Sequence, residues 1–188
     1  QKDAKEGNPR LYDLTSLQVD GNRYYAYSAE ETLNKVQSLY EKKLVTYPRV
    51  DTTYLSEDLH PKIPGILSGL RDYKRFTEAL AGKPIKKSKQ IFDDKKITDH
   101  HAIIPTEKRQ PFSGLTQAEK QLYYLIARQY LAQFYPAYCY SETLVELTIA
   151  GGLFRAKANT ELSAGWKQLY RCGSNQEASQ RSQPNDEL

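Results

Sequence analysis

The sequence contains no methionine, and its first residue is Gln1. A complete translation product begins with methionine, so we expect either a piece of a longer chain or a sequence from which methionines are missing. Cysteine is also scarce: Cys139 and Cys172 are too few for a disulfide framework. Neither stands beside a histidine or another cysteine, so the sequence predicts no zinc site. A reducing, cytoplasmic setting fits this cysteine usage best.

Long apolar runs are absent as well. No stretch approaches the roughly 18–20 apolar residues that a membrane-spanning helix needs, and residues 1–10 show no signal-peptide pattern. The hydrophobic fraction of 39% is sufficient for a modest core. The net charge of +4 weakly favours an anionic partner. Six lysines lie between residues 83 and 96, a pattern that a solvated loop explains equally well.

Three local patterns predict secondary structure clearly. Ser28 and Glu31 form a capping box that opens a helix over 29–42. Thr116 and Glu119 form a second one, which opens a helix over 117–134. Apolar residues then alternate with period two on both sides of a Gly-Gly pair at 151–152, which predicts a β-hairpin.

The remaining segments carry weaker signals. We expect a frayed lead-in at 1–10, a short ordered segment at 11–18, a buried strand or extended turn at 44–48, a helix from Ser56, a helix over 72–81 closed by Gly82, loops over 83–114, a third strand over 165–169 and a disordered tail at 171–188. The predicted fold class is α+β. The expected division is a lead-in at 1–16, a helical domain at 17–115, a helix with a β-meander at 116–170, and the tail.

Tyr47 lies in the segment TYPRVDTTY, which has the residue types for phosphoryl chemistry. A phenol needs nearby positive charge to attack a phosphodiester, because its ordinary pKa is about 10. In an extended backbone Arg49 would share a face with Tyr47 and could grip the same phosphate, and Asp51 could orient Arg49. The chain has 15 tyrosines, however, and most tyrosines serve packing.

His100 and His101 follow in the segment ITDHHAIIPT. Adjacent histidines point in different directions on most backbones, so they make a poor metal pair, and we predict no metal ligands in this chain. A histidine near a phosphate can donate a hydrogen bond or move a proton. A surface histidine beside Asp99 is the simpler alternative on residue type alone.

Three segments together resemble a known family. LYDLTSLQ, ETLNKVQSLYEKKLVTYPRVDTTYL and ITDHHAIIPT, in this order and spacing, are similar to motifs of type IA DNA topoisomerases, and HHAIIPT is typical of the topoisomerase III branch. The resemblance extends from Leu11 to Leu169. It implies that Tyr47 is the nucleophile, that Arg49 assists cleavage, and that His100 lies near the scissile phosphate. Asp51 and His101 are expected to support them, and Arg49, Tyr54, Lys95 and Lys96 to bind DNA.

The resemblance also implies a fold and a mechanism. The family is a torus of four domains, and this chain resembles its tyrosine-bearing domain III, a winged-helix-like unit, with pieces of the strand-rich hinge domain II. The implied reaction cleaves and reseals one DNA strand through a 5′-phosphotyrosine intermediate without ATP, so that another strand can pass. The intact enzyme is expected to use Mg²⁺ held by an acidic domain that this sequence lacks, so we predict that the chain alone is inactive.

The expected partner is single-stranded DNA, with no zinc, no membrane and a monomeric chain, in the cytoplasm of a bacterium at the nucleoid. One alternative is a non-catalytic DNA-binding module of helix-turn-helix character, which the net charge and the helical unit would also fit. A relaxase-type strand nicker is a weaker alternative, because three histidines supply too few metal ligands at suitable spacing.

Overall fold

A computed structural model describes residues 2–70, 74–85, 87–108, 112–150 and 152–171. The chain divides into two compact units, which we call the helical unit (Pro9–Phe134) and the sheet unit (Gln1–Asn8 with Tyr135–Leu188). Within the described residues, no helix combines the length and the apolar character that crossing a bilayer requires. The mixture of helices and an antiparallel sheet confirms the predicted α+β class.

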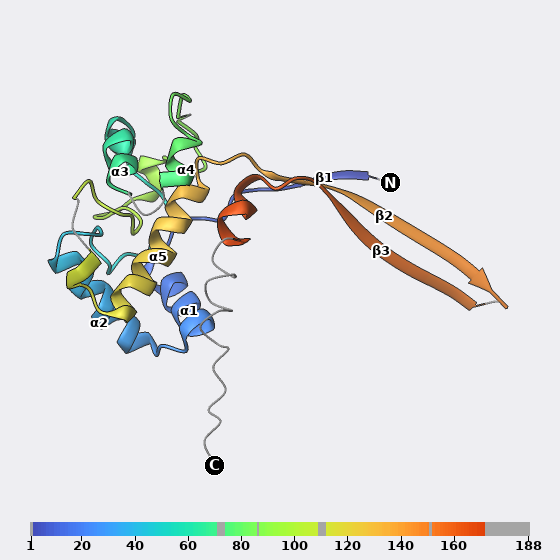
Figure 1. Ribbon diagram of the computed structural model, residues 1–188, viewed down its shortest axis with the longest axis horizontal. Coiled ribbons are helices and arrows are strands. Elements are labelled where there is room, and N and C mark those ends of the chain that lie inside the picture. The colour runs from blue at the N-terminus through green and yellow to red at the C-terminus, as the bar shows by residue number, and fades with distance from the viewer. Residues whose placement is uncertain (1, 71–73, 86, 109–111, 151, 172–188) are drawn as a thin grey trace, which may run out of the picture. The chain divides into compact units, whose positions relative to one another are not determined.

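Three α-helices form the centre of the helical unit (Figure 1): α1 (Leu14–Tyr25), α2 (Ala29–Glu41) and α5 (Gln117–Ala132). Both predicted capping boxes are present at the starts of α2 and α5, where each side chain of the pair bonds the other residue's backbone. The two predicted helices are therefore confirmed to within two residues at each end.

Helix α1 is longer than the short ordered segment expected at 11–18. Asp13 and Ser16 form a third capping box at its start, and Ala26 ends it in a left-handed conformation with φ 58°. The second half of α1 reads VDGNRYY, which has weak helix propensity and no clear apolar stripe. Tertiary packing decides the matter, because a Cβ added at Gly21 would meet Thr32 of α2 and Leu122 of α5.

The core of the helical unit lies between these helices and the loops beside them. Side chains from α1, α2 and α5 are fully buried there, as are several from the loops: Leu17, Val36, Leu39, Leu55, Phe92, Ile103, Ile104, Leu122, Leu125 and Ile126. Burial of this many large side chains, at roughly 1.5–3 kcal/mol each, is the main stabilising contribution to the unit.

Short elements fill the sequence between α2 and α5. They are a 3₁₀ helix at Glu57–Lys62, α3 (Ile63–Gly69), α4 (Lys74–Glu78), and 3₁₀ turns at Asp94–Lys96 and Phe112–Gly114. The helix expected from Ser56 is thus a 3₁₀ turn followed by α3, because Pro61 removes a backbone donor. Of the helix expected over 72–81, the structure shows α4, and Gly82 follows it with φ 74°.

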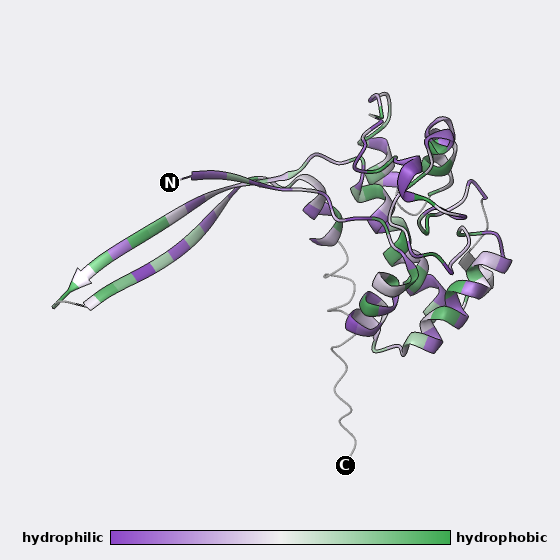
Figure 2. Ribbon diagram, turned by 180° about the vertical axis from the view of Figure 1, so that it is seen from behind, coloured by the Kyte–Doolittle hydropathy of each residue, from purple (hydrophilic) through white to green (hydrophobic). Residues whose placement is uncertain are grey.

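The sheet unit contains a three-stranded antiparallel sheet in the order β1 (Lys2–Glu6), β2 (Tyr138–Ile149) and β3 (Gly152–Ser163). The predicted hairpin is confirmed, and its register pairs Leu147 with Phe154. Strand β1 pairs only with the first part of β2, from Glu6↔Tyr138 to Lys2↔Glu142. Figure 2 shows apolar and polar bands alternating along the paired strands β2 and β3.

Two expectations about strands were wrong. The polar segment KDAKE was expected to fray but forms β1, because a distant partner, β2, supplies its hydrogen bonds. The third strand expected over 165–169 does not form: Gly165–Lys167 is a 3₁₀ turn. Gly165 has a left-handed φ of 47°, and the backbone N–H of Trp166 donates to the Pro136 carbonyl at 3.0 Å. The chain therefore bends where a strand would continue.

The compact units also differ from the expected division at 16/17 and 115/116. Helix α5 packs against α2 and α1 and so belongs to the helical unit, and only residues before Pro9 and after Phe134 belong to the sheet unit. The disordered tail expected at 171–188 lies outside the described residues from Cys172 onward.

Candidate functional site

One segment far away in sequence, residues 102–105, holds the backbone around Tyr47. Thr46 is paired on three sides: its N–H donates to the Ile104 carbonyl at 3.0 Å, its hydroxyl donates to the Ala102 carbonyl at 3.2 Å, and that hydroxyl accepts from the Ile104 N–H at 3.0 Å. An isolated β-bridge joins Val45 to Pro105. The extended backbone predicted at 44–48 is therefore fixed by the segment that follows the two histidines.

The Tyr47 ring lies between two other rings. Its centroid is 4.5 Å from that of His100, with an interplanar angle of 42°. Tyr40, near the end of α2, approaches it edge-on at 5.5 Å and 78°. Tyr47 is half-buried and His100 is exposed. The structure thus brings together the first predicted histidine and the predicted nucleophile, 53 residues apart in the numbering.

Arg49 and Asp51 follow Tyr47 on a backbone that does not stay extended. The Val50 N–H donates to the Pro48 carbonyl at 3.0 Å, which closes a tight turn centred on Arg49. The alternation of an extended strand therefore does not by itself place Arg49 and Tyr47 on one face. Both Arg49 and Asp51 are exposed, and among the described residues neither forms a hydrogen bond or an ion pair. Arg49 is consequently free to meet an anion from solvent.

His101 faces a different environment from His100. It is half-buried, and its Nδ1 lies 2.8 Å from the Ala102 carbonyl oxygen. Burial lowers the pKa of the His101 imidazole, against a smaller rise from that backbone contact and from Asp58. The neutral ring donates its Nδ1 proton to the carbonyl, which suits a supporting role in the loop.

Two further side chains meet at the Tyr54 hydroxyl. Lys96 Nζ donates to it at 2.9 Å and Arg10 Nη1 at 2.5 Å. Tyr54 and Lys96, both expected to bind DNA, are thus neighbours. Lys95 is exposed; its backbone N–H donates to the Asp93 side chain, and its own side chain has no hydrogen-bond partner among the described residues. Sequence reasoning missed Arg10, because nothing in the polar segment around it signals a contact with a residue 44 positions away.

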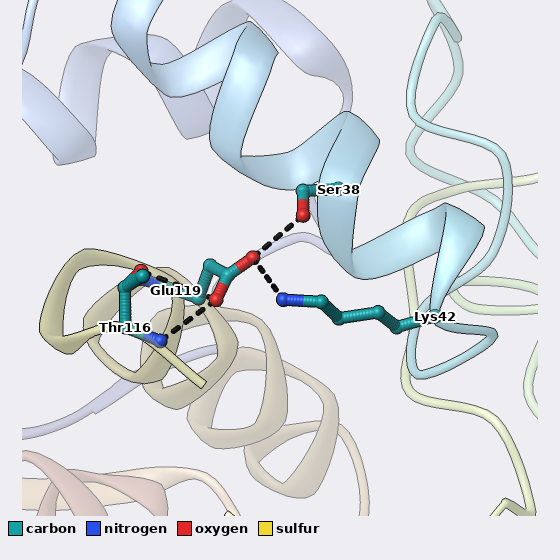
Figure 3. Close-up of polar contacts among 4 residues, drawn as sticks. All are labelled: Ser38, Lys42, Thr116 and Glu119. Carbon is teal, nitrogen blue, oxygen red and sulfur yellow. Dashed lines mark hydrogen bonds and ion pairs between the residues drawn. The ribbon is translucent and has the colours of Figure 1, made fainter. Parts of the chain in front are cut away.

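A buried carboxylate, Glu119 on α5, joins the helices that support the site. Figure 3 shows that its two oxygens accept hydrogen bonds from Ser38 of α2 and from Lys42 at the C-cap of that helix, both at 2.6 Å, and from the Thr116 backbone at 2.8 Å. Burial would raise the pKa of Glu119, but these hydrogen bonds, that of Lys42 foremost, outweigh it and lower the pKa to about 2. The sequence predicted the cap but not the contact with α2.

The described residues offer no donor set for a divalent cation, because no three His, Cys, Asp or Glu side chains converge among them. The Mg²⁺ expected for the intact enzyme therefore does not fit the residues described here, and no chemical step is assigned to it below.

A family model described as DNA topoisomerase matches residues 1–187. This chain belongs to the type IA DNA topoisomerase family. A protein named DNA topoisomerase 3 from Bacillus cereus is 43% identical over 173 residues, and one of the same name from Bacillus subtilis is 44% identical over 174 residues. Each alignment covers 90% of this chain and 24% of the relative. The chain therefore spans about a quarter of the length of these curated relatives.

A solved structure shows the same fold in a more distant protein. Full-length topoisomerase I from Thermotoga maritima aligns with a TM-score of 0.66 at 20% sequence identity, over 100% of this topoisomerase chain and 29% of the other. At this identity the alignment concerns the fold alone. It supports the mixed helix and sheet architecture described above.

Proposed function

We propose that this chain is the tyrosine-bearing part of a topoisomerase of the topoisomerase III branch, and that Tyr47 is its nucleophile. The contact between Tyr47 and His100 carries the proposal, because the two predicted motifs meet there at 4.5 Å between ring centroids. The 42–44% identity to proteins named DNA topoisomerase 3 supports the branch. By this proposal the helical unit corresponds to the winged-helix-like domain III and the sheet unit to pieces of hinge domain II.

The proposed reaction is a transesterification on one DNA strand. The Tyr47 hydroxyl oxygen attacks a backbone phosphorus, and the bond from that phosphorus to the 3′ oxygen breaks. The 3′ oxygen leaves with a proton as a hydroxyl, while the 5′-phosphate stays on Tyr47. The reverse attack of the 3′-hydroxyl reseals the strand, so the energy of the broken bond is kept in the phosphotyrosine and ATP is not needed.

The other site residues would act on the charge of the phosphate. His100, exposed beside the Tyr47 ring, can donate a hydrogen bond to a phosphate oxygen, and the exposed Arg49 can approach it with its planar fork. Neither is tied to a carboxylate among the described residues. Both are therefore available to stabilise negative charge in the transition state.

The test is covalent trapping on single-stranded DNA with the full-length protein. Wild type should leave a protein–DNA adduct after denaturation, and Tyr47→Phe should leave none, since phenylalanine has no oxygen to attack. Tyr40→Phe is the matched control, because it also removes one phenol hydroxyl, from the neighbouring ring that contacts Tyr47 edge-on. An adduct that persists in Tyr47→Phe would show that another residue is the nucleophile.

The same assay separates the proposal from its alternative, a DNA-binding module without chemistry. That alternative expects binding but no adduct in any variant. We also propose that the 188-residue chain by itself binds DNA without cleaving it, because the described residues supply no metal-binding cluster. An adduct formed by the isolated chain would overturn this last part alone.

A further inference from the structure

Arg10, Tyr54 and Lys96 form a compact group, which we call the basic cluster, at the surface of the helical unit. Besides their hydrogen bonds to the Tyr54 hydroxyl, both cations lie near its ring: the Arg10 guanidinium carbon is 5.3 Å and Lys96 Nζ 4.6 Å from the centroid. Each residue comes from a separate segment of the chain. Ordering two long, flexible cationic side chains costs conformational entropy. Their hydrogen bonds and ring contacts with Tyr54 offset that cost and hold both cations in place.

The basic cluster carries uncompensated positive charge. Arg10 and Lys96 both donate to one neutral oxygen, and in the described part of the chain neither forms an ion pair with a carboxylate. Two like charges a few ångströms apart repel each other, by about 1 kcal/mol even in water. An anion placed between them would remove that repulsion and gain two charge-assisted hydrogen bonds.

The Tyr54 hydroxyl completes the group as a third donor. A phenol oxygen has two acceptor positions and one hydrogen. Arg10 and Lys96 use the acceptor positions, so the hydroxyl hydrogen is left for a further acceptor. Hydrogen bonds from Lys96 and then Arg10 also lower the pKa of Tyr54, which makes it a stronger donor. Because Arg10 and Lys96 already lie near the Tyr54 ring, a phosphate fits the basic cluster better than a base stacked on that ring.

A short backbone path connects the basic cluster to Tyr47. The Ala102 N–H donates to the Tyr54 carbonyl at 2.9 Å, and the Ala102 carbonyl accepts from the Thr46 hydroxyl at 3.2 Å. A single residue thus links the segment that bears Tyr54 with the residue before Tyr47. The segment that carries Tyr54 and the segment that carries Tyr47 are therefore both hydrogen-bonded to Ala102.

We infer that Arg10, Tyr54 and Lys96 hold a backbone phosphate of single-stranded DNA, separate from the phosphate that Tyr47 attacks. This inference rests on the proposed function, which supplies the DNA strand. The basic cluster positions the strand, and Tyr47 carries out the chemistry.

The experiment measures binding of a fluorescent oligothymidine to this chain over a series of NaCl concentrations. The variants are Arg10→Gln with Lys96→Gln, and Tyr54→Phe, which keeps the ring and removes the hydroxyl. Lys74→Gln with Lys83→Gln is the control of equal charge change, because both residues are exposed and lie outside the basic cluster. Thermal unfolding by circular dichroism verifies that each variant is folded.

The logarithm of affinity falls with the logarithm of salt by about 0.7 per phosphate neutralised on a single strand. The double variant in the basic cluster should lower that slope by about 0.7–1 relative to the control variant, and Tyr54→Phe should weaken binding with a smaller change in slope. Equal slopes in the two double variants would overturn the phosphate site, while the adduct formed by Tyr47 would be unaffected. If wild type shows no salt-dependent binding, the phosphate site is wrong whatever the adduct assay gives.

Discussion

The ionisation of the Glu119 side chain bears directly on stability. Its side chain is 4% exposed and is held by partners from two helices. A buried carboxylate is tolerated only when its hydrogen bonds replace water, and here Lys42 also supplies the counter-charge. The same end of α2 carries Tyr40, whose ring meets Tyr47. The Glu119 contacts therefore fix the helix that supports the proposed nucleophile.

The lowered pKa of Glu119 predicts how stability varies with pH. Since the folded pKa is about 2 and the ordinary value is 4.5, the ionised carboxylate stabilises the fold fully above pH 4.5, and the contribution is lost as the pH falls towards 2. The shift corresponds to about 3 kcal/mol at neutral pH. Urea unfolding of wild type and Glu119→Gln should differ by roughly this amount at pH 7, and the difference should shrink in acid.

The control for that series is Glu30→Gln, which removes a carboxylate from an exposed position in the first turn of α2. Its cost should stay below about 1 kcal/mol, the usual size of an interaction with the helix dipole. A Glu119→Gln variant whose stability follows that of Glu30→Gln at every pH would contradict the assigned role of the buried carboxylate.

At the scale of elements, the bend after β3 depends on Gly165. Its φ of 47° is unfavourable for residues with a side chain, and an added Cβ would overlap the backbone carbonyl oxygens of Pro136 and Ala137. Neither oxygen belongs to a flexible side chain, so neither can move away easily. Gly165 therefore lets the chain turn back beside the start of β2, where Trp166 packs with 8% of its surface exposed.

Gly165→Ala is expected to destabilise the sheet unit by at least about 2 kcal/mol, from the left-handed backbone and the steric overlap together. The indole fluorescence of Trp166, the only tryptophan in the chain, reports on this unit directly during urea unfolding. Gly7→Ala is the matched control in the same unit, because an added Cβ there meets nothing within 4 Å. Equal midpoints for the two variants would refute the steric argument.

These elements show which features a sequence reveals. Capping boxes at Ser28 and Thr116 are complete within four residues, and the hairpin is announced by local alternation around a Gly-Gly pair, so all three could be predicted. Strand β1 could not, because its five residues carry no apolar pattern and pair with residues more than 130 positions away. The turn at Gly165 was hidden for the same reason: the carbonyls that require glycine come from another segment.

In the candidate site, too, local motifs could be predicted and long-range contacts could not. The residue types and order of its motifs predicted Tyr47 and His100 as site residues, and the structure shows that the two rings are in contact. The Arg10 contact with Tyr54 joins residues 44 positions apart, and the Glu119 contact with Lys42 joins residues 77 positions apart. Both contacts depend on how distant segments pack together. No local pattern encodes such distances, which is why both were missing from the prediction.

At the scale of the whole molecule, the two units differ in how their backbones are protected. In α5 all residues from Leu122 to Ala132 except Tyr124 are buried. In the sheet unit, the outer parts of β2 and β3 pair only with each other. One face of this ribbon presents Val145, Leu147 and Phe154, which are 43–58% exposed, and the other presents charged residues together with the exposed Leu144 and Leu153. Two ion pairs, Arg155–Glu146 and Lys157–Glu142, cross that second face.

Hydrogen exchange should therefore separate the chain into regions of different local stability. A two-stranded ribbon is marginally stable in water, so amides at 144–149 should exchange by local opening, whereas α5 amides require disruption of the core. We expect α5 amides to exchange at least about two orders of magnitude more slowly than the amides at 144–149. Residues 138–142 are the internal control, because β1 pairs with this part of β2 and adds a third strand. They should fall between the two, and protection that is uniform along β2 would show that the third strand adds nothing to its stability.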